Sequence, residues 1–200
     1  MKVFFDWALS NKVELSGTIF GLIYVWFSIR QSILTWPAGI ITSLLYCWVF
    51  LDAKFYAGMG LQSYYVVISL YGWWIWRQGA NGGSNDEKLH VSFTDSNLWI
   101  KLSVITLLLT ILMYYFLKSY TDSPIPFGDA FTTSLSIVAT WMLTRKKIEQ
   151  WLIWIFIDLI SAGLYLYRGL YPTGFLFVVY AIMAGIGFYE WRKEHEKVPC

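Results

Sequence analysis

The sequence is poor in charge, cysteine and proline, and each shortage excludes a class of protein. Only 14% of its 200 residues are charged, whereas a water-soluble domain carries about 25%. The net charge of +2 offers no basic surface for nucleic acid. Two cysteines are too few for a disulfide scaffold, and five prolines with 15 glycines do not make a collagen-like chain. The low share of charged residues also excludes a soluble domain of ordinary composition.

Apolar and aromatic residues take the place of the missing charge. Hydrophobic residues make up 57% of the chain, and 12 tryptophans, 14 tyrosines and 14 phenylalanines bring the aromatic share to 20%. The mean hydropathy is +0.51. This composition excludes a disordered chain and a coiled coil, and it predicts a polytopic membrane protein.

Seven apolar runs are candidates for membrane-spanning helices. A helix that crosses about 30 Å of hydrocarbon needs roughly 20 mostly apolar residues, and about 17 suffice. The runs are Val13–Ile29, Thr35–Leu51, Gly58–Trp76, Leu98–Leu117, Gly128–Leu143, Gln150–Tyr167 and Tyr171–Tyr189. The sequence thus predicts an all-α membrane protein with seven transmembrane helices. The longest polar break runs from Arg77 to Asn97, and within it Gly79–Glu87 is expected to form a flexible linker.

The distribution of lysine and arginine predicts the orientation in the membrane. With seven spans the two termini face opposite sides, and the side with more Lys and Arg is cytoplasmic. Five of these residues fall on the side of the N-terminus: Lys2, Lys12, Lys54, Lys118 and Arg168. Ten fall on the other side: Arg30, Arg77, Lys88, Lys101, Arg145, Lys146, Lys147, Arg192, Lys193 and Lys197. We therefore expect the N-terminus outside and the C-terminus in the cytoplasm.

The chain resembles itself at an offset of 115 residues without gaps. Identical pairs at this offset include Trp26 and Trp141, Arg30 and Arg145, Trp36 and Trp151, Tyr65 and Tyr180, Gly72 and Gly187, and Trp76 and Trp191. Some of these pairs lie at span boundaries, where aromatic belts and charged anchors recur by themselves, so coincidence is the alternative.

A true repeat predicts a specific architecture. Residues 13–77 form a first three-helix repeat, residues 98–117 a linker helix, and residues 128–192 a second three-helix repeat. The added helix lets both repeats enter the membrane in the same direction, which gives a 3+1+3 arrangement of parallel repeats. Repeat-built transporters bind their substrate near the midplane, where the repeats meet.

One carboxylate lies deep within a predicted span. Asp158 is the ninth residue of Gln150–Tyr167, and a charge at that depth costs roughly 2.5–3.5 kcal/mol on insertion scales. Trp151, Trp154 and Asp158 share one helix face through their i, i+3, i+7 spacing. Two indoles and a carboxylate suit a flat, cationic or hydrogen-bond-donating ring. The alternatives are that Asp158 joins two helices and that Trp151 belongs to the interfacial belt.

The third span carries a second polar stripe. Gln62, Tyr65 and Ser69 are also spaced i, i+3 and i+7, so they share a face. A glutamine in hydrocarbon needs partners for its amide and its carbonyl. Contact with a substrate and bonding between helices explain this stripe equally well.

The sequence shows no catalytic apparatus. His90 and His195 are expected in the linker and the tail, away from the spans. The chain contains no GxSxG, HExxH or phosphate-binding loop and no pair of carboxylates within the spans. We therefore expect no enzyme activity, no metal and no cofactor.

Several motifs resemble the Pnu family of bacterial vitamin transporters. Trp36 with Gly39, the run Phe55-Tyr56-Ala57, Leu61-Gln62, and Tyr71-Gly72-Trp73 with Trp76 are similar to the first half of that family. Thr144-Arg145-Lys146, followed by Glu149, Trp151, Trp154 and Asp158, resembles its W-x-x-W-x-x-x-N/D signature. The resemblance covers the chain apart from the Arg77–Asn97 connection and the C-terminal tail.

The resemblance implies a fold, an activity and a site. The fold would be the seven-helix fold of the sugar-transporting SWEET proteins, in the bacterial inner (cytoplasmic) membrane. The activity would be uptake of nicotinamide riboside, thiamine, riboflavin or deoxynucleosides by facilitated diffusion, with the product trapped by a cytoplasmic kinase. The substrate contacts of the family fall on Gln62, Trp151, Trp154 and Asp158 of this sequence.

One residue departs from the nicotinamide riboside members of the family, which carry Asn where this chain has Asp158. An ionised carboxylate only accepts hydrogen bonds, so it suits an exocyclic amine or a positively charged ring. Thiamine and nicotinamide riboside therefore remain equal candidates.

The leading hypothesis is a passive transporter for a cationic aromatic B-vitamin precursor, with Gln62, Tyr65, Trp151, Trp154 and Asp158 as substrate-binding residues. Its partners would be the small-molecule vitamin and the lipid bilayer, with no nucleic acid. Proton-coupled vitamin or nucleoside transport through Asp158 is the first alternative. A membrane scaffold subunit that transports nothing is the second. A homo-oligomer is compatible with the sequence, which does not decide the oligomeric state.

Overall fold

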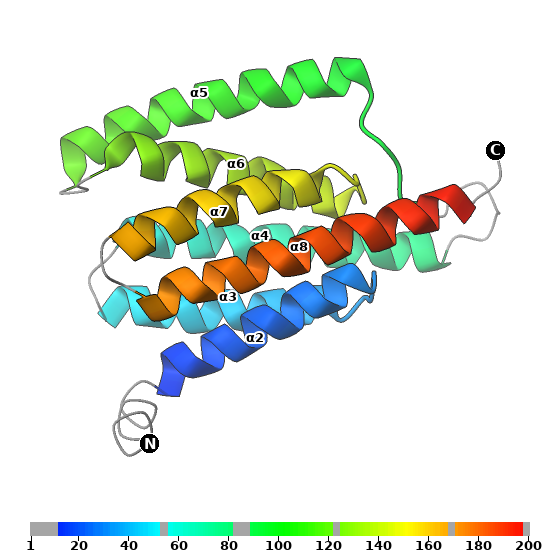
Figure 1. The fold of residues 1–200 in the computed structure, drawn as a ribbon, viewed down its shortest axis with the longest axis horizontal. Coiled ribbons are helices and arrows are strands. Elements are labelled where there is room, and N and C mark those ends of the chain that lie inside the picture. The colour runs from blue at the N-terminus through cyan, green and yellow to red at the C-terminus, as the bar shows by residue number, and fades with distance from the viewer. Residues whose placement is uncertain (1–11, 53–55, 82–88, 122–124, 168–170, 198–200) are drawn as a thin grey trace. The chain divides into compact units, whose positions relative to one another are not determined.

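The computed structural model describes residues 12–52, 56–81, 89–121, 125–167 and 171–197. Within these ranges the chain forms seven helices and no strand longer than an isolated bridge. The helices are α2 (Lys12–Ile29), α3 (Thr35–Asp52), α4 (Tyr56–Asn81), α5 (Ser96–Tyr120), α6 (Pro126–Thr144), α7 (Gln150–Tyr167) and α8 (Tyr171–Lys197) (Figure 1). The predicted all-helical fold with seven helices is confirmed.

Local signals in the sequence account for several helix ends. The Asp95 side chain caps α5 by accepting a hydrogen bond from the Leu98 N–H at 3.2 Å. Pro126 stands at the first position of α6, where its missing N–H costs nothing. Both helices therefore begin where their sequence can satisfy or omit the free N–H groups of a first turn.

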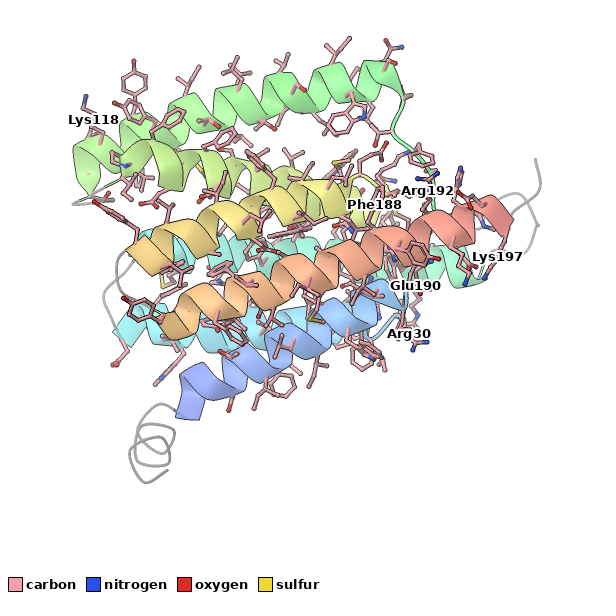
Figure 2. All side chains as sticks on the ribbon, in the orientation of Figure 1. Arg30, Lys118, Phe188, Glu190, Arg192 and Lys197 are labelled. Atoms are coloured by element: carbon pink, nitrogen blue, oxygen red, sulfur yellow. The ribbon has the colours of Figure 1, made fainter. Side chains whose placement is uncertain are left out.

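Two helices run further than their apolar spans. Helix α4 continues to Asn81 and α8 to Lys197, so Gly79–Asn81 is helical and His195 lies in a helix. The expectation of a linker beginning at Gly79 and of His195 in a tail was therefore wrong, because both helices continue past the end of their apolar segments. Residues 82–88 of the expected linker lie outside the described residues. Figure 2 shows Arg192 and Lys197 on this charged end of α8.

The composition of the helices is that of a membrane protein fold. By length and hydropathy alone, three helical segments in the described ranges could each cross a membrane: Ser96–Tyr120, Gln150–Tyr167 and Thr173–Lys197. Hydroxyl side chains within the helices bond to the preceding turn, as Thr106 Oγ1 does to the Leu102 carbonyl at 2.8 Å and Ser134 Oγ to the Ala130 carbonyl at 2.7 Å. Such bonds satisfy polar groups where no water is available.

The chain divides into two compact units, residues 1–88 and residues 89–200. In the first unit α3 packs against both α2 and α4. Glycines let side chains approach closely there: the Tyr46 ring of α3 lies 3.0 Å from where a Cβ on Gly17 of α2 would stand. In the same way the Tyr24 ring of α2 lies 3.0 Å from where a Cβ on Gly39 of α3 would stand. These two reciprocal contacts join α2 to α3.

The second unit contains the four helices α5 to α8, and each packs against the next in the chain. Leu102 of α5 forms a buried cluster with Val138 and Met142 of α6, and Ile153 of α7 packs against this cluster. Helix α5 buries little else, because Leu102 and Thr110 are its buried residues. Most of its apolar side chains are therefore available to lipid.

Both units contain the same tryptophan contact at the predicted offset. Trp36 meets Trp76 edge to face with ring centroids 5.0 Å apart, and Trp151 meets Trp191 in the same way at 5.5 Å. Trp36 lies over Gly72. The Trp151 indole lies 2.7 Å from where a Cβ on Gly187 would stand. Identical sequence positions thus make identical contacts in the two units.

The turn after the first helix of each triplet is also shared. Gln31 and Lys146 both have φ of 50°, in the left-handed region that side chains rarely adopt. The guanidinium of Arg30 lies 5.0 Å from the Trp26 ring centre, and that of Arg145 lies 5.9 Å from the Trp141 ring centre. Helices α3 and α7 begin and end at positions related by the same 115-residue offset. These features recur at the offset seen in the sequence, while the boundaries 13–77, 98–117 and 128–192 stay a prediction.

Residues 89–95, which we call the docked segment, bind the loop between α6 and α7. The Ser92 N–H donates to the Lys146 carbonyl at 3.2 Å, and the Ser92 carbonyl accepts from the Ile148 N–H at 3.1 Å. The Thr94 N–H and hydroxyl donate to the two Glu149 carboxylate oxygens at 2.7 and 2.9 Å. This part of the Arg77–Asn97 connection is therefore held within the second unit by hydrogen bonds to the loop between α6 and α7.

The end of α8 lies against the same segment. His195 Nδ1 is 2.9 Å from the Val91 carbonyl oxygen, and the His195 ring meets the Phe93 ring edge to face at 5.1 Å. Burial lowers the pKa of Lys146, while the nearby Glu194 carboxylate acts in the opposite direction. Hydrogen bonds and a ring contact thus connect the docked segment, the loop between α6 and α7, and the end of α8.

Replacing Gly187 with alanine is expected to destabilise the second unit, because the new Cβ would stand 2.7 Å from the Trp151 indole. Overpacking of this kind costs about 1–3 kcal/mol. Gly185 is the matched control: it lies on the same helix with nothing within 4 Å of an added Cβ, so Gly185→Ala should gain roughly 0.5–1 kcal/mol. Thermal unfolding in detergent measures both. A Gly187→Ala melting temperature at or above that of the unmodified protein would contradict the contact.

Glu149→Ala is expected to release the docked segment, because the Thr94 N–H loses its acceptor. A partly buried donor left unpaired costs about 1–3 kcal/mol, so amide hydrogen exchange at residues 89–95 should accelerate roughly 5- to 150-fold. Glu196→Ala is the control, since it breaks only the exposed Arg192–Glu196 ion pair at 3.1 Å. Equal exchange rates in the two variants would show that Glu149 does not hold the segment.

Candidate functional site

Helix α7 carries the three residues that the sequence singled out on one face. Asp158 is 5% exposed and Trp151 is 3% exposed, while Trp154 between them is half-buried. All three face away from the exposed side of α7, on which Leu152, Phe156 and Leu159 lie. The structure therefore brings Trp154 and Asp158 together within one turn of a single helix.

Trp151 is occupied by packing inside its own unit. Its ring meets Trp191 at 89° between the ring planes and lies over Gly187 of the same helix, α8. Its indole Nε1 is buried and has no hydrogen-bond partner among the described residues. Trp36, its counterpart in the first unit, makes the same contact with Trp76. The arrangement explains Trp151 as the residue that holds α7 to α8.

Trp154 and Asp158 have no such partners. No hydrogen bond or ion pair from a described residue reaches the Asp158 carboxylate, and no described aromatic ring stacks on Trp154. The counterparts of these residues at the 115-residue offset are Gly39 and Ser43, so this part of α7 is not repeated in the first unit. A buried carboxylate without a partner is costly unless a cation or donor approaches it. Chemically, this face offers one aromatic ring and one strong acceptor to a ligand.

Gln62 and Tyr65 lie on α4 of the first unit, and both are half-buried. Ser69, which completes their stripe, is 3% exposed. The Tyr65 ring lies 5.6 Å from that of Tyr64. The predicted residues therefore form two sets, one on α4 and one on α7, that belong to different units.

The structure adds two residues that the sequence analysis did not single out. Gln150 is fully buried at the start of α7, and neither its amide nitrogen nor its oxygen has a partner among the described residues. Thr35, its counterpart at the start of α3, is fully buried and its hydroxyl is likewise unpaired within the described chain. The signal that could have found them was the offset itself, because both are polar residues directly before a repeated tryptophan.

Metal binding has no support in the part of the chain that the structure describes. No group of three or more His, Cys, Asp or Glu side chains converges there. Cys47 is a free, half-buried thiol on α3, with its sulfur 3.8 Å from the Met59 carbonyl oxygen.

Comparison with known proteins shows the family. The profile of the nicotinamide mononucleotide transporter family matches residues 11–193. The chain belongs to this family. The match spans all the described helices apart from a few terminal residues, and it confirms the resemblance that the tryptophan motifs indicated.

Relatives in this transporter family are similar over most of their length. The nicotinamide riboside transporter PnuC of Escherichia coli is 24% identical over 201 residues, with 90% of this chain and 84% of that protein covered. The riboflavin/roseoflavin transporter RibM of Streptomyces davaonensis is 27% identical over 185 residues, covering 89% of this chain and 83% of the relative. The crystal structure of the vitamin B3 transporter PnuC matches the fold with a TM-score of 0.77 at 22% identity, covering 98% of this chain and 87% of that one.

Trp151→Ala and Trp154→Ala should differ sharply in their effect on stability. Truncating a buried tryptophan costs about 3–5 kcal/mol, and Trp151 is 3% exposed against Trp191. Trp154 is half-buried, so its truncation should cost clearly less. Trp36→Ala is the matched control, because it removes the same contact from the first unit. Thermal unfolding in detergent gives the comparison, and equal losses at Trp151 and Trp154 would refute the packing role.

Proposed function

We propose that this protein takes up a cationic aromatic B-vitamin precursor, thiamine or nicotinamide riboside, by facilitated diffusion across the bacterial inner membrane. Membership of a transporter family supports transport. The names of the relatives, nicotinamide riboside transporter and riboflavin/roseoflavin transporter, support a vitamin as substrate. The observation that carries the choice of a cation is the buried carboxylate of Asp158, which no described residue meets with a hydrogen bond or ion pair.

Asp158 favours a positively charged ring for an electrostatic reason. An ionised carboxylate that is 5% exposed has lost most of its hydration, which costs free energy. The attraction of a cation that binds beside it offsets this cost. Trp154, one turn before it, can contact the face of that ring and adds the attraction between a cation and an indole. Both thiamine and nicotinamide riboside carry a positive ring, so the two remain joint candidates.

Residues on α4 complete the proposed contacts. Gln62 can donate and accept hydrogen bonds, and Tyr65 presents a ring and a hydroxyl. We assign polar groups of the substrate to these two side chains, which lie on the half-buried face of α4. Trp151, also predicted as a substrate contact, is assigned the supporting role of keeping α7 against α8 through Trp191.

The direction and driving force complete the proposal. The excess of Lys and Arg on one side favours an outside N-terminus and a cytoplasmic C-terminus. Net uptake would then depend on removal of the product inside, by phosphorylation in the cytoplasm. The two repeats, 13–77 and 128–192, would move relative to the linker helix 98–117 during the cycle.

Asp158→Asn should lower the affinity for thiamine by roughly tenfold or more, because a charge-assisted interaction worth about 1.5–3 kcal/mol is lost. Uptake of radiolabelled thiamine and nicotinamide riboside into proteoliposomes measures the effect. Asp52→Asn is the control, since Asp52 is an exposed carboxylate at the end of α3. Unchanged uptake in Asp158→Asn would remove Asp158 from the site.

The same buried carboxylate supports one other candidate, proton-coupled transport. An acid within the membrane that has no described partner can carry a proton along with the substrate. A pH gradient across the proteoliposome membrane would then drive accumulation above equilibrium. Facilitated diffusion predicts equal inner and outer concentrations whatever the gradient.

A further inference from the structure

The docked segment, residues 89–95, is held to the second unit by more than its backbone. Lys147 Nζ donates to the Ser92 hydroxyl and to the Phe93 carbonyl, each at 3.0 Å. Ser92 and Lys147 also form a parallel β-bridge, and Val91 is only 6% exposed. Backbone hydrogen bonds, side-chain hydrogen bonds and burial therefore fix the segment together, and all the residues concerned belong to the same unit.

The hydrogen bonds of the docked segment continue into the first turn of α7. The Ile148 N–H donates to the Ser92 carbonyl, and the Ile148 carbonyl accepts from the Trp151 N–H, both at 3.1 Å. The Glu149 carboxylate is bound by the docked segment, while the Glu149 carbonyl accepts from the Leu152 N–H at 3.0 Å. The residues that bind the segment are thus the same residues whose carbonyls begin α7.

Helix α7 carries the proposed substrate contacts shortly after this start. Trp154 and Asp158 follow Trp151 by three and seven positions, which is about one and two turns. Backbone hydrogen bonds link each turn of a helix to the next, so a shift of the first turn moves the turns that follow. The placement of these two side chains therefore depends on how the start of α7 is held.

The turn before α3 is the counterpart of this turn in the first unit, and its side chains differ. At the 115-residue offset Leu34 stands where the second unit has Glu149, and Leu34 is 50% exposed. Ile33 is 40% exposed, whereas its counterpart Ile148 is fully buried. The carboxylate that binds the docked segment thus precedes α7, the helix with the proposed contacts, and is replaced by an apolar side chain before α3.

We propose that the docked segment positions α7 for substrate binding and stays bound to the turn before α7 throughout the transport cycle. The inference rests on the proposed function, because it takes Trp154 and Asp158 as substrate contacts. Glu149 is then a positioning residue that acts on the substrate through α7 without touching it. A site whose residues are held in place before binding loses less free energy in ordering them.

The alternative is that the docked segment is a gate that leaves the turn in every cycle. Undocking would break the hydrogen bonds of Ser92, Thr94 and Lys147 together, and it would expose Val91. Segments that open readily have few buried contacts and hydrogen bonds exposed to solvent. The contacts of the docked segment are of the opposite kind, and they favour a fixed element.

A reversible disulfide tests whether the segment stays bound. Ser92 and Lys147 are bridge partners whose side chains meet, and paired strands are close enough for a disulfide. The variant Ser92→Cys/Lys147→Cys is made in the full-length protein together with Cys47→Ser and Cys200→Ser, so that no other thiol can react. Mass spectrometry verifies the disulfide, and its failure to form would contradict the bridge.

Uptake of radiolabelled thiamine and nicotinamide riboside into proteoliposomes is then compared between the oxidised and the reduced protein. A segment that stays bound predicts rates that agree to within about twofold, because the disulfide restrains nothing that moves in the cycle. The reduced protein is the control for the substitutions themselves. Loss of uptake on oxidation, with recovery on reduction, would show a gate and overturn the inference.

Glu149→Ala tests whether the segment positions α7. Calorimetric titration in detergent should show the Kd of thiamine and nicotinamide riboside raised roughly three- to tenfold, the scale of a change that acts through a neighbouring element. Amide hydrogen exchange at residues 150–154 should accelerate too, because the start of α7 is released. Glu196→Ala, which breaks only an exposed ion pair, is the control and should change neither. A role in stability alone would lower the melting temperature and leave the Kd unchanged.

A rescue experiment separates the positioning role from other effects of the lost carboxylate. Oxidation of the variant Ser92→Cys/Lys147→Cys/Glu149→Ala should bring the Kd and the exchange at residues 150–154 back toward those of the parent disulfide protein, since a covalent bond then holds the segment. No recovery of either quantity on oxidation would overturn the positioning role.

Thr94→Val is the second variant, for the case that Glu149→Ala does not fold. It removes the hydroxyl bond to Glu149 and keeps the bond from the Thr94 N–H, so the Kd should rise in the same direction by a smaller factor. An unchanged Kd in both variants, with faster exchange at residues 89–95, would overturn the inference and leave the proposed function standing.

The failure of the proposed function gives a different result. Absence of binding and uptake for both vitamins in the unmodified protein would overturn that function. Exchange at residues 150–154 still tests the docked segment in that case, because it needs no substrate. Unchanged exchange there in Glu149→Ala would show that the segment does not hold α7.

Discussion

The structure depends on one contact that occurs once in each unit, a buried tryptophan set edge to face against a second tryptophan and over a glycine. Trp36 does this with Trp76 and Gly72, and Trp151 with Trp191 and Gly187. In a bilayer the hydrophobic effect does not hold helices together, so association relies on close packing at small residues. The glycine is what permits the approach, and the paired indoles supply the contact area.

This contact determines what the rest of α7 can do. With Trp151 held by α8, the rotation of α7 is set, and Trp154 and Asp158 follow on the same face within two turns. Most other polar groups in the spans are satisfied locally, as the hydroxyls of Thr106, Ser134 and Thr140 are by the preceding turn of their own helix. The Asp158 carboxylate cannot be satisfied in this way. It accepts hydrogen bonds but has no proton to donate to a carbonyl of the preceding turn. A buried carboxylate of this kind is costly unless a cation or a hydrogen-bond donor approaches it.

The sequence predicted the helices well where hydropathy decides them. Helix α7 has the predicted bounds Gln150–Tyr167, because an apolar run in a membrane protein must satisfy its backbone as a helix. Hydropathy could not predict the extension of α8 to Lys197 or the docking of residues 89–95. The docked segment depends on partners such as Glu149, 55 residues from Thr94, and no local pattern encodes such a distant pair. Periodicity likewise gave the face of Trp151 but not its partner Trp191.

The differences between the repeats say more about function than the similarities do. Positions that hold helices together are kept at the offset, as the tryptophan pairs, their glycines and the left-handed turns at Gln31 and Lys146 show. Positions near the proposed site diverge: Gly39 against Trp154, and Ser43 against Asp158. The repeat therefore accounts for the packing of α3 and α7 alike, but an indole and a carboxylate stand at these two positions on α7 alone. What distinguishes α7 from α3 is thus a pair of side chains that the shared packing does not require.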